Sequence, residues 1–105
     1  MTKKYQGSAR VKRAQLQALR KDFETLQMKK LESVTDYFGR VMGTANKMRI
    51  HGDKLDDVTI IKKILRSMAL KFDYVVCSIE ESNNIDEMLI DELQSSLLVH
   101  EQRLN

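Results

Sequence analysis

Two stretches decide the fold of this 105-residue chain: residues 16–28, LQALRKDFETLQM, and residues 32–41, ESVTDYFGRV. The first carries apolar residues at the three- and four-residue intervals of a helix face: Leu16, Leu19, Phe23 and Leu26. This periodicity predicts a helix with one buried stripe. We expect the helix to begin at Ser8, whose hydroxyl can accept a hydrogen bond from a first-turn amide, and to end near residues 29–30.

The second stretch opens a second predicted helix. Ser33 is its expected N-cap, and Gly52, which follows His51, can take the left-handed conformation that ends a helix. Its apolar face is formed by Val34, Phe38, Val41, Ala45 and Met48, and is widened by Tyr37 and Met42. Gly39 and Gly43 lie four residues apart inside this helix, and we expect them to let a neighbouring helix approach closely.

Three further segments follow. Asp56 or Asp57 is expected to cap a helix over residues 58–68, whose solvent side carries Lys62, Lys63 and Arg66. Residues 72–79, FDYVVCSI, can be interpreted as a strand, but their apolar spacing fits a short helix better. A polar loop over residues 80–87 then leads to a last helix over residues 90–103. The predicted core positions here are Ile61, Ile64, Leu65, Met68, Phe72, Val75, Val76, Ile79, Leu93, Leu97 and Leu104, with Leu98 beside them.

The composition agrees with an all-α fold. The sequence has no Pro and only 4 Gly, too few turn-forming residues for a many-stranded sandwich or barrel. We therefore predict one domain over residues 1–105, a compact bundle of about five short-to-medium helices with a flexible start at residues 1–7. No apolar run reaches the roughly 18 residues of a membrane span. The start of the chain also lacks the apolar core of a signal peptide.

The charge is distributed unevenly along the chain. Residues 1–30 carry nine Lys or Arg and two acids, a balance of +7, whereas residues 76–105 carry one Arg and seven acids, a balance of −6. A basic front can attract polyanions, or the acidic back of another copy. The simpler interpretation is two solvated helix faces of different sign. The candidate nucleic-acid-binding residues are Lys3, Lys4, Arg10, Lys12, Arg13, Arg20 and Lys21.

The residue types that carry enzyme chemistry are sparse. We expect His51 to lie at a helix end, His100 on the flank of the last helix, and Cys77 to be a small core residue. One cysteine excludes a zinc site built from several thiolates, and no glycine-rich phosphate loop is present. The sequence therefore predicts no enzyme, no cofactor, no metal and no small-molecule substrate.

The two opening stretches resemble the Gag polyprotein of copia-type long-terminal-repeat retrotransposons, most closely those of plants. Three later segments continue the resemblance: residues 64–68 (ILRSM), 72–76 (FDYVV) and 91–104 (DELQSSLLVHEQRL). The resemblance covers nearly the whole chain. It implies a helical region like a retroviral capsid that self-associates into a cytoplasmic, virus-like shell around the element's RNA. It supplies no catalytic residue.

The chain departs from the family pattern in several places. Further upstream helices and a following zinc knuckle are expected in family members, so we expect a fragment or truncated copy with part of an apolar surface uncovered. Leu31 stands where a helix-ending Gly is common, residues 69–70 where Pro is frequent, and Leu89 where Ser or Thr usually caps the last helix. Such leucines are either exposed or packed at a subunit contact.

Three functions stay open from the sequence. The leading hypothesis is an assembly module whose partner is another copy of itself or a full-length Gag. The alternatives are an RNA-binding module that uses the basic first helix, and a truncated Gag relic that is inert or regulates assembly. None of the three requires a membrane.

Overall fold

The computed structural model describes the backbone of residues 2–82 and 84–104, and the side chains of residues 9–82 and 84–104. This part of the chain holds five α-helices, two short 3₁₀ turns and no strand. In order they are α1 (Thr2–Thr25), α2 (Val34–Ile50), α3 (Asp57–Arg66), η1 (Leu70–Phe72), α4 (Asp73–Ser82), η2 (Ile85–Glu87) and α5 (Ile90–Leu104). The predicted all-α fold is confirmed, and so is the helical interpretation of residues 72–79.

Helix α1 differs from the prediction at both ends. It begins at Thr2 and runs on through Gly7 and Ser8, so the N-cap expected at Ser8 is wrong. It ends at Thr25, where the hydroxyl donates to the Lys21 carbonyl over 3.0 Å. The flexibility expected of residues 1–7 stays a prediction.

Helix α2 begins and ends where the sequence predicts. The Ser33 hydroxyl accepts a hydrogen bond of 3.1 Å from the Asp36 amide, and Gly52 has φ +97° directly after the C-cap residue His51. The first turn has a second cap from a distant helix, because a carboxylate oxygen of Glu101 on α5 accepts from the Val34 amide over 2.7 Å. This bond ties the C-terminal helix to the start of α2.

A single core runs through the bundle and joins α2, α3 and α5 to the end of α1. The buried residues among the predicted core positions are Phe23, Leu26, Val34, Tyr37, Phe38, Val41, Ala45, Met48, Ile61, Ile64, Leu65, Phe72, Ile79, Leu93 and Leu97. The partly buried ones are Leu16, Leu19, Met42, Met68, Val75, Val76 and Leu98. Three predicted positions differ from expectation: Leu104 and Cys77 are exposed, and Lys63, expected on the solvent side of α3, is buried. Met28 and Ile60, which are not among the predicted core positions, are buried as well.

Lys63 is buried because it has a specific acceptor. Its ammonium donates to the Glu24 carbonyl over 2.7 Å, which satisfies an acceptor in the last turn of α1. Burial, with a contribution from nearby Arg66, lowers the pKa of Lys63. The residue therefore ties α3 to the end of α1.

The polar loop expected at residues 80–87 is shorter than predicted. Helix α4 runs to Ser82, and Ile85 to Glu87 form η2, whose amides are capped by Asn84.

The N-cap of α3 is Asp56, one of the two predicted candidates. Its carboxylate accepts a hydrogen bond from the Thr59 amide. The hydrogen bonds from Thr59 hold the pKa of Asp56 below its usual range.

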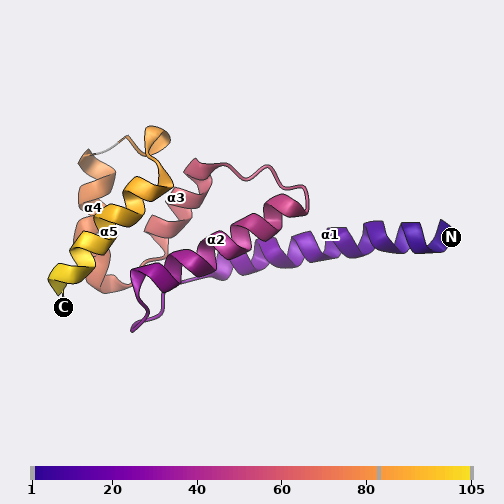
Figure 1. Ribbon diagram of the computed structural model, residues 1–105, viewed down its shortest axis with the longest axis horizontal. Coiled ribbons are helices and arrows are strands. Elements are labelled where there is room, and N and C mark those ends of the chain that lie inside the picture. The colour runs from indigo at the N-terminus through magenta and orange to yellow at the C-terminus, as the bar shows by residue number, and fades with distance from the viewer. Residues whose placement is uncertain (1, 83, 105) are drawn as a thin grey trace.

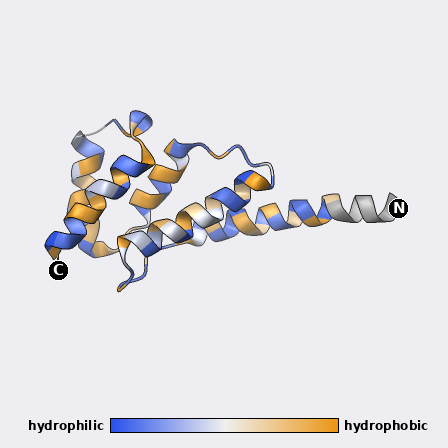
Figure 2. Ribbon diagram, viewed as in Figure 1, coloured by the Kyte–Doolittle hydropathy of each residue, from blue (hydrophilic) through white to orange (hydrophobic). Residues whose placement is uncertain are grey.

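The first half of α1 projects away from the bundle (Figure 1). The molecule measures 58 × 29 × 17 Å with a radius of gyration of 16.4 Å, against roughly 13 Å for a compact chain of this length. All side chains from Ala9 to Gln15 are exposed. Figure 2 shows that polar and apolar residues alternate along the helices, as amphipathic packing requires.

Candidate interaction surfaces

The turn between α1 and α2 is held rigidly by an ion pair. Arg40 donates to both carboxylate oxygens of Glu32 over 2.6 Å and to the Gln27 carbonyl over 2.7 Å. The same carboxylate accepts from the Lys29 amide over 3.0 Å. The hydrogen bond from Arg40 lowers the pKa of Glu32, and the same hydrogen bond raises the pKa of Arg40. We call this arrangement the Arg40 clamp.

The clamped turn presents a leucine to solvent. The Glu32 amide donates to the Lys29 carbonyl over 3.1 Å, so Lys30 and Leu31 occupy the tip of a β-turn. Leu31 is 93% exposed. Nothing among the described residues covers this side chain, although the backbone that carries it is firmly anchored.

Beside this tip lies a second exposed leucine. The Met28 amide donates to the Ser67 carbonyl over 2.9 Å, which holds the α1–α2 turn against the segment that leads into η1. Leu70, the first residue of η1, is 84% exposed. The two segments enclose an open depression, which we call the leucine hollow, lined by Met28, Lys30, Leu31, Ala69, Leu70 and Lys71. The sequence shows that both leucines depart from the family pattern, but it does not show that they lie side by side.

An acidic surface lies at the start of α5. Leu89 is 60% exposed, and its amide donates to a Glu92 carboxylate oxygen over 3.0 Å. Asp86, Glu87 and Asp91 are exposed around it, and none of them forms an ion pair with another residue in the described part of the chain. We call the set of Asp86, Glu87, Leu89, Asp91 and Glu92 the acidic edge.

The predicted nucleic-acid-binding residues are only partly brought together. Arg10, Arg13 and Arg20 share one side of α1 by helical spacing, whereas Lys12 lies on the other. Arg20 is already paired, because its guanidinium donates to an Asp53 carboxylate oxygen over 3.1 Å. Lys21 is exposed near the bundle, and the side chains of residues 3–4 lie outside the described ones.

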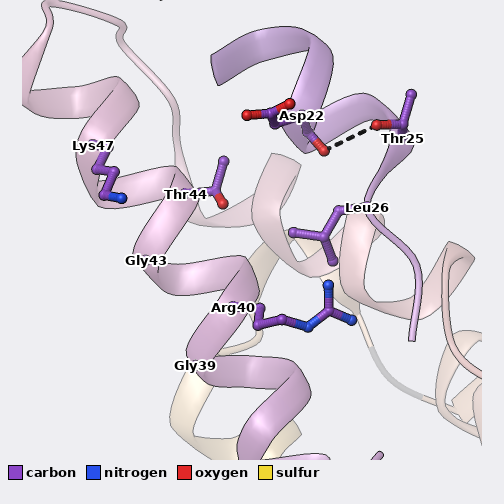
Figure 3. A pocket seen from close by; sticks show the side chains of 8 residues that line it. All are labelled: Asp22, Thr25, Leu26, Gly39, Arg40, Gly43, Thr44 and Lys47. Atoms are coloured by element: carbon purple, nitrogen blue, oxygen red, sulfur yellow. Dashed lines mark hydrogen bonds between the residues drawn. The ribbon is translucent and has the colours of Figure 1, made fainter. Parts of the chain in front are cut away.

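The two glycines of α2 do not serve the purpose predicted for them. A Cβ atom at Gly39 or Gly43 would meet no atom within 4 Å, so no helix packs closely there and that prediction is wrong. Figure 3 shows both glycines at an open depression between α2 and the end of α1. The side chains of Leu26 and Arg40 point toward this space.

The histidines and the cysteine form no shared site. His51 lies at the end of α2, with Nδ1 2.8 Å from the Lys47 carbonyl and Nε2 3.1 Å from Gln15. His100 packs its ring 5.9 Å from that of Phe72. Cys77 is exposed, which corrects the prediction of a core position, because α4 turns that face to solvent. Among the described side chains, those of residues 9–82 and 84–104, there is no group suited to hold a metal ion.

Comparison with known protein families shows to which family the chain belongs. Over residues 1–105 the sequence matches the family described as gag-polypeptide of LTR copia-type. The chain belongs to this Gag family. The resemblance seen in the sequence is therefore confirmed, and with it a retrotransposon-derived, structural type of protein. Neither the curated proteins nor the solved structures contain a match to this Gag chain.

The leucine hollow beside the Arg40 clamp and the acidic edge are the candidate interaction surfaces of this Gag domain. Gag domains form a structural, non-catalytic family. No helix in the described part of the chain is long and apolar enough to cross a membrane.

Proposed function

We propose that this Gag-derived chain is a non-enzymatic assembly module that self-associates, or joins a full-length Gag, in the cytoplasm. The observation that carries the proposal is the pair of leucines on anchored backbone, 93% and 84% exposed, that line one depression beside the buried core. Apolar surface on a rigid scaffold is typical of protein contacts, because its burial is favourable and costs little ordering. Leu31 and Leu70 supply such a surface here.

Light scattering coupled to size-exclusion chromatography tests the assembly. Nuclease-treated protein is measured over a hundredfold range of concentration at low salt, and the mean mass is expected to rise with concentration. A mass equal to that of one 12.2 kDa chain at every concentration would contradict the proposal. Nuclease treatment ensures that RNA does not hold the particles together.

Binding of RNA is a second candidate, favoured by the charge of the projecting helix. Between Ala9 and Lys21, α1 carries five cationic residues and no acid, and all five are exposed. The residues in question are Arg10, Lys12, Arg13, Arg20 and Lys21. A helix of this kind can neutralise phosphates on a single strand and release their counterions.

The salt dependence of binding tests the RNA candidate. A triple variant, Arg10→Gln with Lys12→Gln and Arg13→Gln, is expected to lower the slope of log affinity against log salt by about 2 for single-stranded RNA. The control removes three exposed lysines from other elements: Lys47, Lys54 and Lys62. Equal losses in the two variants would show attraction to overall charge and contradict a site on α1.

A further inference from the structure

We propose that the leucine hollow of one copy receives the acidic edge of a second copy. This inference rests on the proposed self-association and names the two surfaces that form it. Its parts are the exposed Leu31 and Leu70 with Lys30 and Lys71 on one side, and the exposed Leu89 with its neighbouring carboxylates on the other. The contact joins unlike surfaces of identical chains.

The hollow is built to receive an apolar group. Among its lining residues Met28 is buried and Ala69 half-buried, while Leu31 and Leu70 have exposed side chains. The Arg40 clamp and the Met28–Ser67 hydrogen bond fix the two segments, so a partner does not have to order them. An inserted leucine would be buried against preformed apolar walls.

The charges around the hollow select an acidic occupant. Lys30 and Lys71 line it, and Lys29 is exposed next to the turn. Two hollows facing each other across a two-fold axis would bring these ammonium groups together, which is unfavourable. The acidic edge carries the opposite charge, and its carboxylates surround an exposed leucine, Leu89.

The placement of the two surfaces makes the contact intermolecular. Figure 1 shows the α1–α2 turn at the lower margin of the molecule and η2, in orange, at the upper margin. One chain cannot close such a contact on itself. A contact between unlike surfaces continues from copy to copy, producing rings or open chains rather than a closed dimer.

A paired apolar substitution tests the hollow. Leu31→Ser combined with Leu70→Ser removes exposed side chains and leaves the core unchanged, so the helicity and melting temperature should stay as in the unsubstituted protein. We expect self-association to weaken at least about tenfold, as the loss of two buried leucines implies. The control is Ile50→Ser, which removes an apolar side chain 80% exposed at the end of α2.

A charge exchange tests the partner surface. Variant one carries Lys30→Glu and Lys71→Glu in the hollow, and variant two carries Asp86→Lys and Glu87→Lys at the edge. Each alone places like charges at the contact and is expected to stay monomeric. When mixed in equal amounts they restore complementary charge at both possible contacts, and particles of higher mass are expected to return.

The outcomes separate this inference from the proposed function. If the unsubstituted protein is monomeric throughout, the proposed self-association fails and this contact fails with it. If the protein associates but none of the three double substitutions weakens it, only the contact proposed here is overturned. Binding of monomers to vesicles of three parts phosphatidylcholine and one part phosphatidylserine, lost in the leucine variant without any self-association, would overturn it in favour of a lipid surface.

Discussion

Replacing Arg40 by alanine removes the side chain that anchors the α1–α2 turn. Three hydrogen bonds are lost, two to Glu32 and one to the Gln27 carbonyl. The Glu32 side chain is only 7% exposed, so its carboxylate keeps the Lys29 amide but loses its counter-charge. Breaking a buried pair costs about 3–5 kcal/mol, and breaking a surface pair about 0–1 kcal/mol. Because the Arg40 side chain is 36% exposed, we expect an intermediate loss of about 2 kcal/mol.

Urea denaturation followed by circular dichroism measures this loss. The matched control is Arg49→Ala, which removes a guanidinium from the same helix that also binds one carbonyl and one carboxylate. Its partner Asp57 has a side chain 57% exposed, so we expect a loss of at most about 1 kcal/mol. Equal losses in the two variants would refute the reasoning that the shielded carboxylate makes the Arg40 clamp stronger.

The pH dependence provides an independent check of the Arg40 clamp. The pKa of Glu32 is lower in the folded state, so its pairing with Arg40 stabilises the protein above the unfolded pKa and is lost as the pH falls through the folded one. The difference in stability between Arg40→Ala and the unsubstituted protein should therefore shrink below about pH 4. A difference that stays constant from pH 7 to pH 3 would contradict an ionic contribution.

Four further substitutions test two tertiary hydrogen bonds and two glycine positions by the same urea assay. Glu101→Ala removes the carboxylate cap from the Val34 amide and should cost about 1 kcal/mol; no loss would show that water replaces the cap. Gly39→Ala, in the open interior of α2, should stabilise by up to about 1 kcal/mol, whereas Gly52→Ala at φ +97° should destabilise by about as much. Lys63→Met retains the buried stem but leaves a carbonyl of α1 without its donor, and should cost about 1–2 kcal/mol; an unchanged stability would contradict the tie between α3 and α1.

The parts of the fold that depend on local signals could be predicted from the sequence. Ser33 and Gly52 mark the ends of α2 because a cap and a left-handed residue act on neighbouring amides and carbonyls. The apolar stripes likewise placed most core residues, since burial follows helical periodicity. The N-cap prediction at Ser8 is wrong because a good capping residue can also lie within a helix, as Ser8 does in α1.

The parts that depend on distant partners could not be predicted. Lys63 looks solvated by periodicity, yet its ammonium finds a carbonyl 39 residues earlier in the chain. The leucine hollow needs Leu31 and Leu70 side by side, and only the Met28–Ser67 hydrogen bond shows that the two segments meet. The spacing of Gly39 and Gly43 suggested a close contact, but nothing local reveals that their side of α2 is open.

The choice of salt distinguishes the two kinds of contact proposed for this chain. Potassium chloride weakens both, because it screens Lys30 and Lys71 against the acidic edge and competes with RNA for the cations of α1. Sulfate also screens charge, but it strengthens the burial of apolar side chains such as Leu31 and Leu70. At equal ionic strength, self-association should therefore survive better in sulfate than in chloride, whereas RNA binding by Arg10 and its neighbours should gain nothing from the exchange. Association that falls equally in both salts would mean that charge alone holds the copies together, and that the exposed leucines are not at the contact.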